Sequence, residues 1–266
     1  MKTLAGTLGL IGNPFEHYTA ETEPNIADYA VRPPYLQAIS DRVRGLSSFI
    51  LFGDRGAGKS ATRITVYAEI WGAAEAAHKK NPLVVNLTDY SSIQEQLRKD
   101  RLKDRDIISI VAFVVIEQVL VWLSSLDESD REVYIEGLDN GERTLVLALL
   151  KGFYLSVSES DRQVSTAESL RLLNSAWTTK SAVWASQRWD ALAKIIASAV
   201  NALSKKEIDQ SVDISGAAES LLQSLKGDSP NAPRAILAKL VEFVKAFGFS
   251  GVSVLVDKGG RNPCHI

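Results

Sequence analysis

One stretch of the sequence decides the fold: Ser48-Phe49-Ile50-Leu51-Phe52-Gly53-Asp54-Arg55-Gly56-Ala57-Gly58-Lys59-Ser60. Its first five residues form an apolar run without helical period, and this run predicts a short strand. The glycines that follow predict a turn, and the residues from Lys59 onward predict a helix that continues to the polar stop at His78-Lys79-Lys80. The turn satisfies the pattern G-x-x-x-x-G-K-[ST] and lies between a predicted strand and a predicted helix, which is the context that a phosphate-binding loop requires.

The chemistry of such a loop is anion binding. Its glycines let successive backbone N–H groups curl around phosphate oxygens, and the helix N-terminus adds the positive end of its dipole. We expect Lys59 to reach the β- and γ-phosphate oxygens and the Ser60 hydroxyl to join the coordination shell of Mg²⁺. The predicted nucleotide contacts in this region are Gly53, Asp54, Arg55, Gly56, Ala57, Gly58, Lys59, Ser60 and Ala61.

Two further apolar runs predict buried strands. Residues 83–87 follow the break at Asn81-Pro82, and residues 252–256 follow a predicted helix over 232–247 that stops at Gly248. Connections of this length imply parallel pairing, so we predict an α/β fold with a parallel P-loop NTPase sheet, three-layered and incomplete. Asp257 ends the last strand, where an aspartate can hold Mg²⁺ opposite the phosphate loop. We therefore predict Ser60 and Asp257 as metal ligands, and Lys59 and Asp257 as the catalytic residues.

The middle of the chain predicts helices without a further strand. Helical segments are expected near 142–157, 165–177, 181–205 and 213–225. The apolar run 107–126 is interrupted by Glu117-Gln118, which would lie near the midplane of a membrane, so it predicts a helix buried in a protein core. Residues 95–106 mix both charges and predict a solvated helix face, whereas the acidic residues 127–143 predict an exposed connection.

These segments divide the chain into four predicted parts. Residues 1–90 form an N-terminal arm and the P-loop half of an NTPase core, and residues 91–230 form a helical insertion. Residues 231–257 supply the return helix and the strand before Asp257, and residues 258–266 form an irregular tail.

Composition excludes several classes of protein. With 45% hydrophobic and 23% charged residues, the 266-residue chain is neither disordered, nor collagen-like, nor a coiled-coil rod. Thirty Lys and Arg against 32 Asp and Glu leave a net charge of −2, so bulk charge gives no support for nucleic-acid binding. Cys264 is the single cysteine, which excludes a disulfide framework and favours a reducing, cytoplasmic setting. Because the apolar run 107–126 is interrupted by Glu117-Gln118, we expect no membrane partner.

The chain resembles bacterial AAA+-like P-loop ATPases, of the initiator or origin-recognition type and of the STAND signalling type. The resemblance covers roughly residues 10–90 and 231–257, and it is carried by Asn13-Pro14-Phe15, Glu21, the run from Tyr29 to Tyr35, the run from Phe49 to Gly53, and the run from Gly58 to Arg63. It implies ATP and Mg²⁺ as cofactors and a protein partner or a second copy of the chain. It also implies that Asn13, Phe15, Val31 and Pro33 lie near the adenine base.

The chain departs from this family at two places. Residues 91–230 stand where one further helix usually suffices, and Asp257 is followed by Lys258, where many ATPases carry a glutamate that orients the attacking water. The family also continues with a sensor strand, an arginine finger and a helical lid, whereas here only residues 258–266 follow. Three origins fit this tail: a natural end, a truncation and a shift of reading frame.

Two functions from different classes follow. The first is an ATP-binding core that acts as a nucleotide-dependent switch, with weak or no hydrolysis by this chain alone. The second is a non-enzymatic helical interaction module with a degenerate phosphate loop. A phosphoryl transferase is disfavoured because no base for an acceptor follows the loop at short range.

Overall fold

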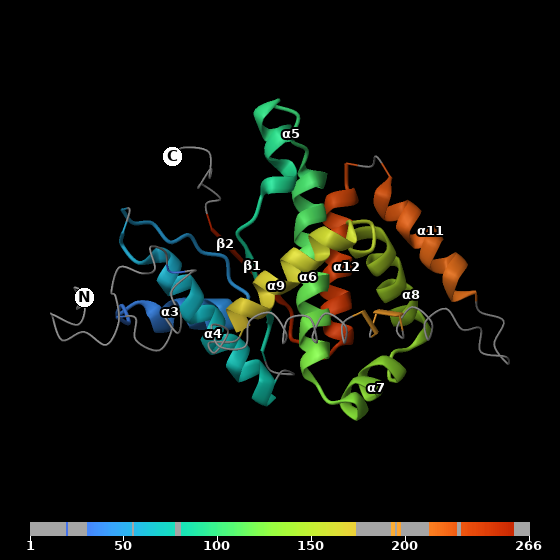
Figure 1. Cartoon of the computed structure of the whole chain (residues 1–266), viewed down its shortest axis with the longest axis horizontal. Helices are drawn as coiled ribbons and strands as arrows, with labels where there is room; N and C mark the ends of the chain where they lie inside the picture. The colour runs from blue at the N-terminus through green and yellow to red at the C-terminus, as the bar shows by residue number, and fades with distance from the viewer. Residues whose placement is uncertain are drawn as a thin grey trace, which may run out of the picture.

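The computed structural model describes residues 20, 31–54, 56–77, 81–173, 193–194, 196–197, 213–227 and 230–257. The described residues form a mostly helical α/β structure with a two-stranded parallel sheet (Figure 1). Its elements, in chain order, are α3 (Leu36–Arg44), α4 (Lys59–Ala77), β1 (Leu83–Leu87), the 3-10 turn η2 (Ser91–Ile93), α5 (Gln94–Arg98), α6 (Asp104–Ser125), α7 (Glu128–Glu136), α8 (Asn140–Leu149), the π-helix η3 (Leu150–Tyr154), α9 (Glu159–Leu173), α11 (Ile214–Lys226), α12 (Ala232–Ala246) and β2 (Val252–Val256).

The sheet joins two strands that lie far apart in the sequence. β1 pairs with β2 in parallel, in a register that runs from Leu83 opposite Val252 to Leu87 opposite Val256. Both strands were predicted, and so was a parallel sheet, so these expectations are confirmed. Because the strands are parallel, their carboxyl ends meet at one edge, and Asp257 begins there.

The predicted strand over residues 48–52 is wrong, because this segment is neither strand nor helix. It keeps the alternation of a strand: Phe49 and Leu51 pack against the core, whereas Ile50 and Phe52 are 78% and 84% exposed. What it lacks is a ladder of backbone hydrogen bonds, which requires a neighbouring strand. The described sheet therefore has two strands instead of the predicted three.

Helices cover both faces of this sheet (Figure 1). Successive side chains of a strand point to opposite faces, and the two hydrophobic clusters divide the strands accordingly. On one face Val84 and Leu255 pack with residues of α3 and α4. On the other face, α6 and α12 pack with Leu83, Val85, Val252 and Val254. The hydrophobic cluster on the face of α6 and α12, the larger of the two clusters, continues into α8, η3 and α11. The middle helices therefore share a core with the strands.

α6 is the central helix of the larger cluster. Its polar pair is buried: Glu117 is 1% exposed and accepts hydrogen bonds from Ser165 (2.6 Å) and Thr166 (3.1 Å) of α9. Within the described ranges, α6 is the one helix long and apolar enough to cross a membrane, and 61% of its most apolar window is buried inside the protein. The prediction of a helix buried in a protein core is thus confirmed.

The remaining helical predictions divide into confirmed, corrected and untested ones. α8 with η3, α9 and α11 confirm helices near 142–157, 165–177 and 213–225, whereas most of 181–205 and all of 258–266 lie outside the described residues. Residues 127–143 are exposed or partly exposed except for Leu138, which is buried in the core. They are more than the predicted connection, because α7 forms there without a buried residue.

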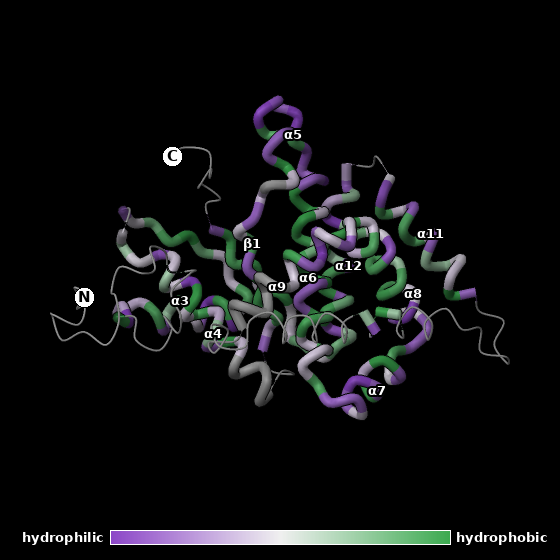
Figure 2. Tube along the Cα trace, viewed as in Figure 1, coloured by the Kyte–Doolittle hydropathy of each residue, from purple (hydrophilic) through white to green (hydrophobic). Residues whose placement is uncertain are grey.

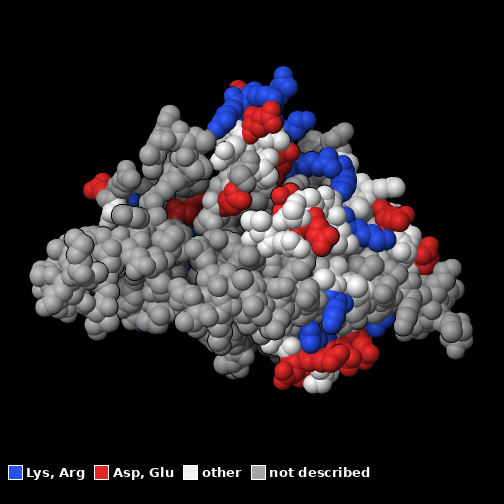
Figure 3. Space-filling view, in the orientation of Figure 1, with Lys and Arg blue, Asp and Glu red and all other residues white. Residues whose placement is uncertain are grey.

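Exposed charge gathers at two ends of the molecule. Polar residues dominate α5 and α7 in Figure 2, whereas apolar residues are concentrated in the helices between them. In Figure 3 lysine and arginine gather over the tip that contains α5, and acidic residues gather over α7. Residues 95–101 are exposed, and Lys99 pairs with Glu95 on the same helical face. The charged residues are solvated as predicted, but they do not form one helix face, because residues 99–103 are a non-helical connection between α5 and α6.

Candidate functional site

The loop before α4 has the conformation that its glycines were expected to permit. Gly56 and Gly58 adopt φ values of +85° and +76°, which residues with a Cβ atom rarely adopt. The chain turns at Asp54, whose carbonyl accepts from the Ala57 N–H (3.2 Å), and α4 then begins at Lys59. No other atom lies within 4 Å of the space where a Cβ on either glycine would stand. The loop therefore presents an open, exposed helix N-terminus, which is the geometry of an anion-binding site.

The Lys59 ammonium lies over this loop. Its Nζ donates to the backbone carbonyl oxygens of Gly53 and Asp54, both at 2.7 Å. The side chain is thus held at the mouth of the loop by neutral acceptors, and no carboxylate among the described residues pairs with it. A phosphate oxygen that entered the loop would meet this ammonium and the amides at the start of α4 together.

Asp257 stands opposite the loop, at the edge where both strands end. Its Oδ2 accepts a hydrogen bond from the Ser60 Oγ at 3.0 Å, although 197 positions separate the two residues in the sequence. The Asp257 backbone is fixed as well, because its N–H donates to the Leu87 carbonyl at 3.2 Å. The structure therefore brings together the two residues that were predicted as metal ligands.

Arg63, one helical turn beyond Ser60, holds the same carboxylate from the other side. Its Nε donates to Asp257 Oδ2 at 3.2 Å, and another nitrogen of the guanidinium donates to Asn86 Oδ1 on β1 at 2.8 Å. The Arg63 side chain is 8% exposed and that of Asp257 30%, so this ion pair is partly shielded from water. α4 and the ends of both strands are thereby joined by one polar network.

Tyr90 closes the network on the side of β1. Its hydroxyl lies 3.2 Å from the Leu87 carbonyl and 3.3 Å from the Asp257 carbonyl. Partial burial raises the pKa of Tyr90, and the negative charge of Asp257 raises it further, whereas Arg63 opposes the rise. The hydroxyl therefore stays protonated at neutral pH and pins the turn after β1 to the end of β2.

The donor set suits a hydrated Mg²⁺ ion bound together with phosphates. Such an ion takes one or two carboxylates, and its remaining ligands are waters and phosphate oxygens. Ser60 and Asp257 supply one hydroxyl and one carboxylate side by side. Among the described residues, no group of three or more His, Cys, Asp or Glu residues forms a cage that would hold a metal without phosphate.

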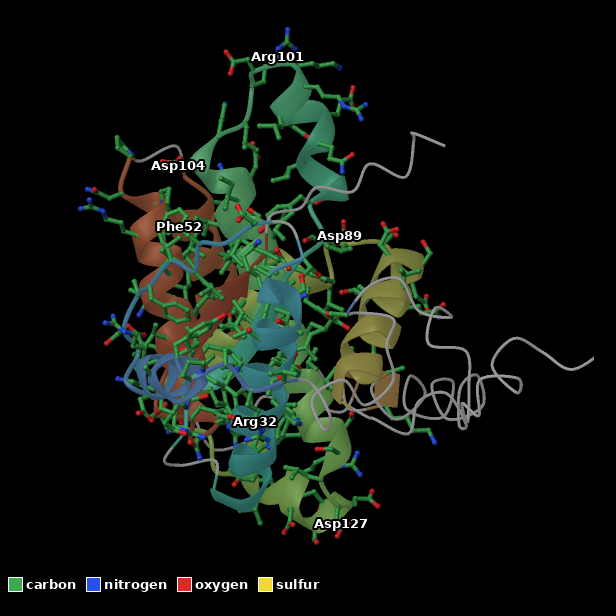
Figure 4. The ribbon with its side chains drawn as sticks, turned by 90° about the vertical axis from the view of Figure 1, so that its left-hand side faces the viewer. Arg32, Phe52, Asp89, Arg101, Asp104 and Asp127 are labelled. Carbon is green, nitrogen blue, oxygen red and sulfur yellow. The ribbon has the colours of Figure 1, made fainter. Side chains whose placement is uncertain are left out.

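The residues predicted to contact adenine lie away from the loop or outside the described residues. Arg32, between Val31 and Pro33, pairs with Glu69 of α4 at 2.9 Å, about 15 Å along the helix from Lys59 at 1.5 Å per residue. Figure 4 accordingly shows Arg32 and Phe52 well apart along α4. The structure thus places Val31 and Pro33 beside the middle of α4, and their contact with a base stays a prediction. Asn13, Phe15 and Arg55 lie outside the described residues.

Sequence reasoning missed two members of the polar network, Asn86 and Tyr90. Asn86 is the one polar residue in the apolar run Leu83-Val84-Val85-Asn86-Leu87, so its type was an available signal. Tyr90 follows the strand in a loop without a motif, and only the fold shows that it reaches Asp257. Arg63, the last residue of the run from Gly58 that carries the family resemblance, contacts Asp257 and Asn86 in the structure.

Comparisons with known proteins give no guide to this site: no family model, no curated protein and no solved structure matches the chain.

Proposed function

We propose that this chain is the ATP-binding core of a P-loop ATPase of the AAA+ or STAND kind, in which Mg²⁺·ATP acts as a switch. The nucleotide occupies the loop before α4, and its presence sets the position of the helices that pack against the sheet. The partner is another protein or a second copy of the chain, and the setting is the cytoplasm.

One observation carries the proposal: Ser60 Oγ and Asp257 Oδ2 lie 3.0 Å apart across 197 positions of sequence. A chance glycine turn has no reason to face an aspartate at the end of a distant strand. A hydroxyl at the start of a helix and a carboxylate at a strand end, placed together beside a lysine-bearing loop, have the chemistry of a metal–phosphate site.

Each residue of the site has a role in binding. The backbone amides around Gly56 and Gly58 and the start of α4 receive phosphate oxygens, and Lys59 neutralises their charge. Ser60 and Asp257 hold the magnesium shell, and Mg²⁺ supplies neutralisation of the β- and γ-phosphates when it is bound. Arg63 keeps the Asp257 carboxylate turned toward Ser60 because it binds the same oxygen.

This chain is expected to bind nucleotide with weak or no turnover. Hydrolysis needs a group that orients the attacking water and an arginine that stabilises the transferred charge. The position after Asp257 carries Lys258 instead of an acidic residue. Among the described arginines, Arg63 is the nearest to the loop in sequence. Its guanidinium binds Asp257 and Asn86, so it does not serve as the arginine that stabilises the transferred charge.

The proposal is tested by calorimetric titration of Mg²⁺·ATP into the wild-type chain and into Lys59→Ala. We expect micromolar binding in the wild type and its loss in the variant, with GTP as a weaker competitor. Lys99→Ala is the matched control, because Lys99 is an exposed lysine whose carboxylate partner, Glu95, lies on α5. Equal affinity in Lys59→Ala and the wild type, or no binding by either, would contradict the proposal and favour a helical interaction module without nucleotide.

A further inference from the structure

A cavity of about 1090 Å³ lies beside the sheet, between the carboxyl end of β1, η3 and the helices α6 and α9. Asp89, labelled in Figure 4, marks the end of the cavity that adjoins the turn after β1. None of the described residues of the loop before α4 lines it. Its volume is that of pockets that enclose cofactor-sized molecules.

Two amide groups in the cavity wall have hydrogen-bond donors without a partner. Gln118 of α6 is 4% exposed, and its Nε2 has no partner among the described residues, although its Oε1 accepts from the Tyr67 hydroxyl at 3.1 Å. The Nδ2 of Asn86 is also buried and meets no hydrogen-bond partner in the described part of the chain, while its Oδ1 accepts from Arg63. A buried amide N–H without a partner is costly, so such groups call for an acceptor.

The rest of the wall is suited to a flat apolar body. Ile110, Phe113 and Val114 contribute from α6, and Phe153 contributes from η3. η3 is a five-residue π-helix, an irregularity that occurs mostly in single turns and is frequent at functional sites. Here it brings Gly152 and Phe153 to the cavity in place of a further regular turn of α8.

Charge in the wall is unfavourable to a polyanion. The acidic residues outnumber the basic ones, with Asp89, Asp106, Glu117 and Asp161 against Arg105 and Lys226. Glu117 is also buried, and it is held by the hydroxyls of Ser165 and Thr166. A triphosphate would be repelled here, so this cavity and the phosphate loop differ in the ligands that they fit.

We propose that this cavity is a second binding site, for an uncharged heteroaromatic molecule that carries carbonyl or ring-nitrogen acceptors. The acceptors pair with the amide side chains of Gln118 and Asn86, and the ring packs on the apolar part of the wall that includes Phe113 and Phe153. Because Asn86 also binds Arg63, the ligand touches the polar network that holds Asp257. The site itself does not depend on nucleotide binding.

The test is ligand-observed NMR with a library of neutral heteroaromatic fragments, applied to the full chain. We expect a set of mutually competing fragments whose affinity falls about tenfold in Gln118→Met, which removes the amide donor at nearly constant volume. The same fragments are expected to bind Lys59→Ala as well as wild type and to resist displacement by Mg²⁺·ATP. Failure of nucleotide binding is thereby separated from failure of this proposal.

A second variant protects the test against misfolding, because Gln118→Met also removes the acceptor of Tyr67. Val164 of α9 lines the cavity but is 73% exposed, so Val164→Trp narrows the cavity without disturbing a packed core. Val133→Trp on α7 is the matched control, because Val133 is 70% exposed and lies outside the cavity. Fragment binding lost in Val164→Trp and kept in Val133→Trp supports the site. No fragment binding by the wild type, or binding that neither cavity variant weakens, overturns it.

Discussion

The Nε atom of Arg63 lies 3.2 Å from the Oδ2 atom of Asp257, so the helix that follows the glycine loop is tied to the end of the last strand. The arginine is almost fully buried, whereas the carboxylate keeps some contact with water. The pair therefore has both a structural role and a role in orienting the carboxylate.

Arg63→Met is expected to destabilise the fold by about 1.5–3 kcal/mol, because Asp257 and Asn86 lose a charged donor in a partly buried place. Chemical denaturation measures the change. Arg32→Met is the control, since the Arg32 side chain is 64% exposed in its pair with Glu69, and we expect about 0–1 kcal/mol there. Equal effects of the two substitutions would show that the Arg63 network adds no stability.

Asp257→Asn is expected to remove the contribution of magnesium to nucleotide affinity. The amide keeps the shape of the side chain and an acceptor for Ser60, but it lacks the charge that a hard cation requires. The Kd for Mg²⁺·ATP should rise by about tenfold or more, or 1.4 kcal/mol, whereas the Kd for ATP in excess chelator should stay unchanged. A variant that retains the full magnesium effect would exclude Asp257 as a ligand.

Stability is expected to fall as the pH rises above about 10. Burial raises the pKa of Tyr67 above its ordinary value, and the charge of Glu117 raises it further, so the folded chain holds this proton more tightly than the unfolded chain. The stabilisation is complete below the unfolded pKa and is lost as the pH rises. In Tyr67→Phe the free energy of unfolding should fall less steeply with pH than in the wild type, by up to about 1.4 kcal/mol per pH unit. Denaturation curves between pH 9 and pH 11, roughly the range around an ordinary tyrosine pKa, measure it, and identical slopes would contradict this assignment.

The N-terminus of α8 offers a test of local stability. Asp139 accepts from the Glu142 N–H at 2.8 Å, and Glu142 accepts from the Asp139 N–H at 3.0 Å, which forms a capping box. Asp139→Ala should lower the free energy of unfolding by about 1 kcal/mol. Asp127→Ala is the control, because Asp127 caps α7 without a side-chain hydrogen bond and its loss should have little effect. Thermal or chemical denaturation of both variants measures the two losses of stability. Equal losses would contradict a stabilising role of the Asp139 side chain.

The sequence predicted elements whose signals are local. The helix that begins at Lys59, the apolar helix α6 and the strands β1 and β2 were all found from periodicity and from glycine or proline punctuation. The Ser60–Asp257 pair was also predicted, because a motif and a strand end specify where each residue must stand. Helix α7 was missed, since the acidic composition of 127–143 was interpreted as a connection.

The errors arise where structure depends on distant partners. Residues 48–52 have a strand pattern, yet a strand exists only when another strand completes its hydrogen bonds, and no local signal reports this. The contacts of Asn86 and Tyr90 likewise depend on the register of β1 against β2. The cavity beside α6 was not foreseen because its wall combines segments that lie far apart in the sequence.

Residues 48–52, which have the pattern of a strand but no neighbouring strand among the described residues, and the outer edge of β2 affect how the protein behaves in concentrated solution. Within the described part of the chain β2 pairs with β1 alone, so its other edge lacks a neighbouring strand, and Val256 on this strand is 63% exposed. Ile50 and Phe52 add two large apolar side chains on an extended backbone. An open edge of this kind is a template for pairing between copies. Self-association of the purified chain should therefore begin here, and a lysine at position 50 would be the simplest means to improve its solubility.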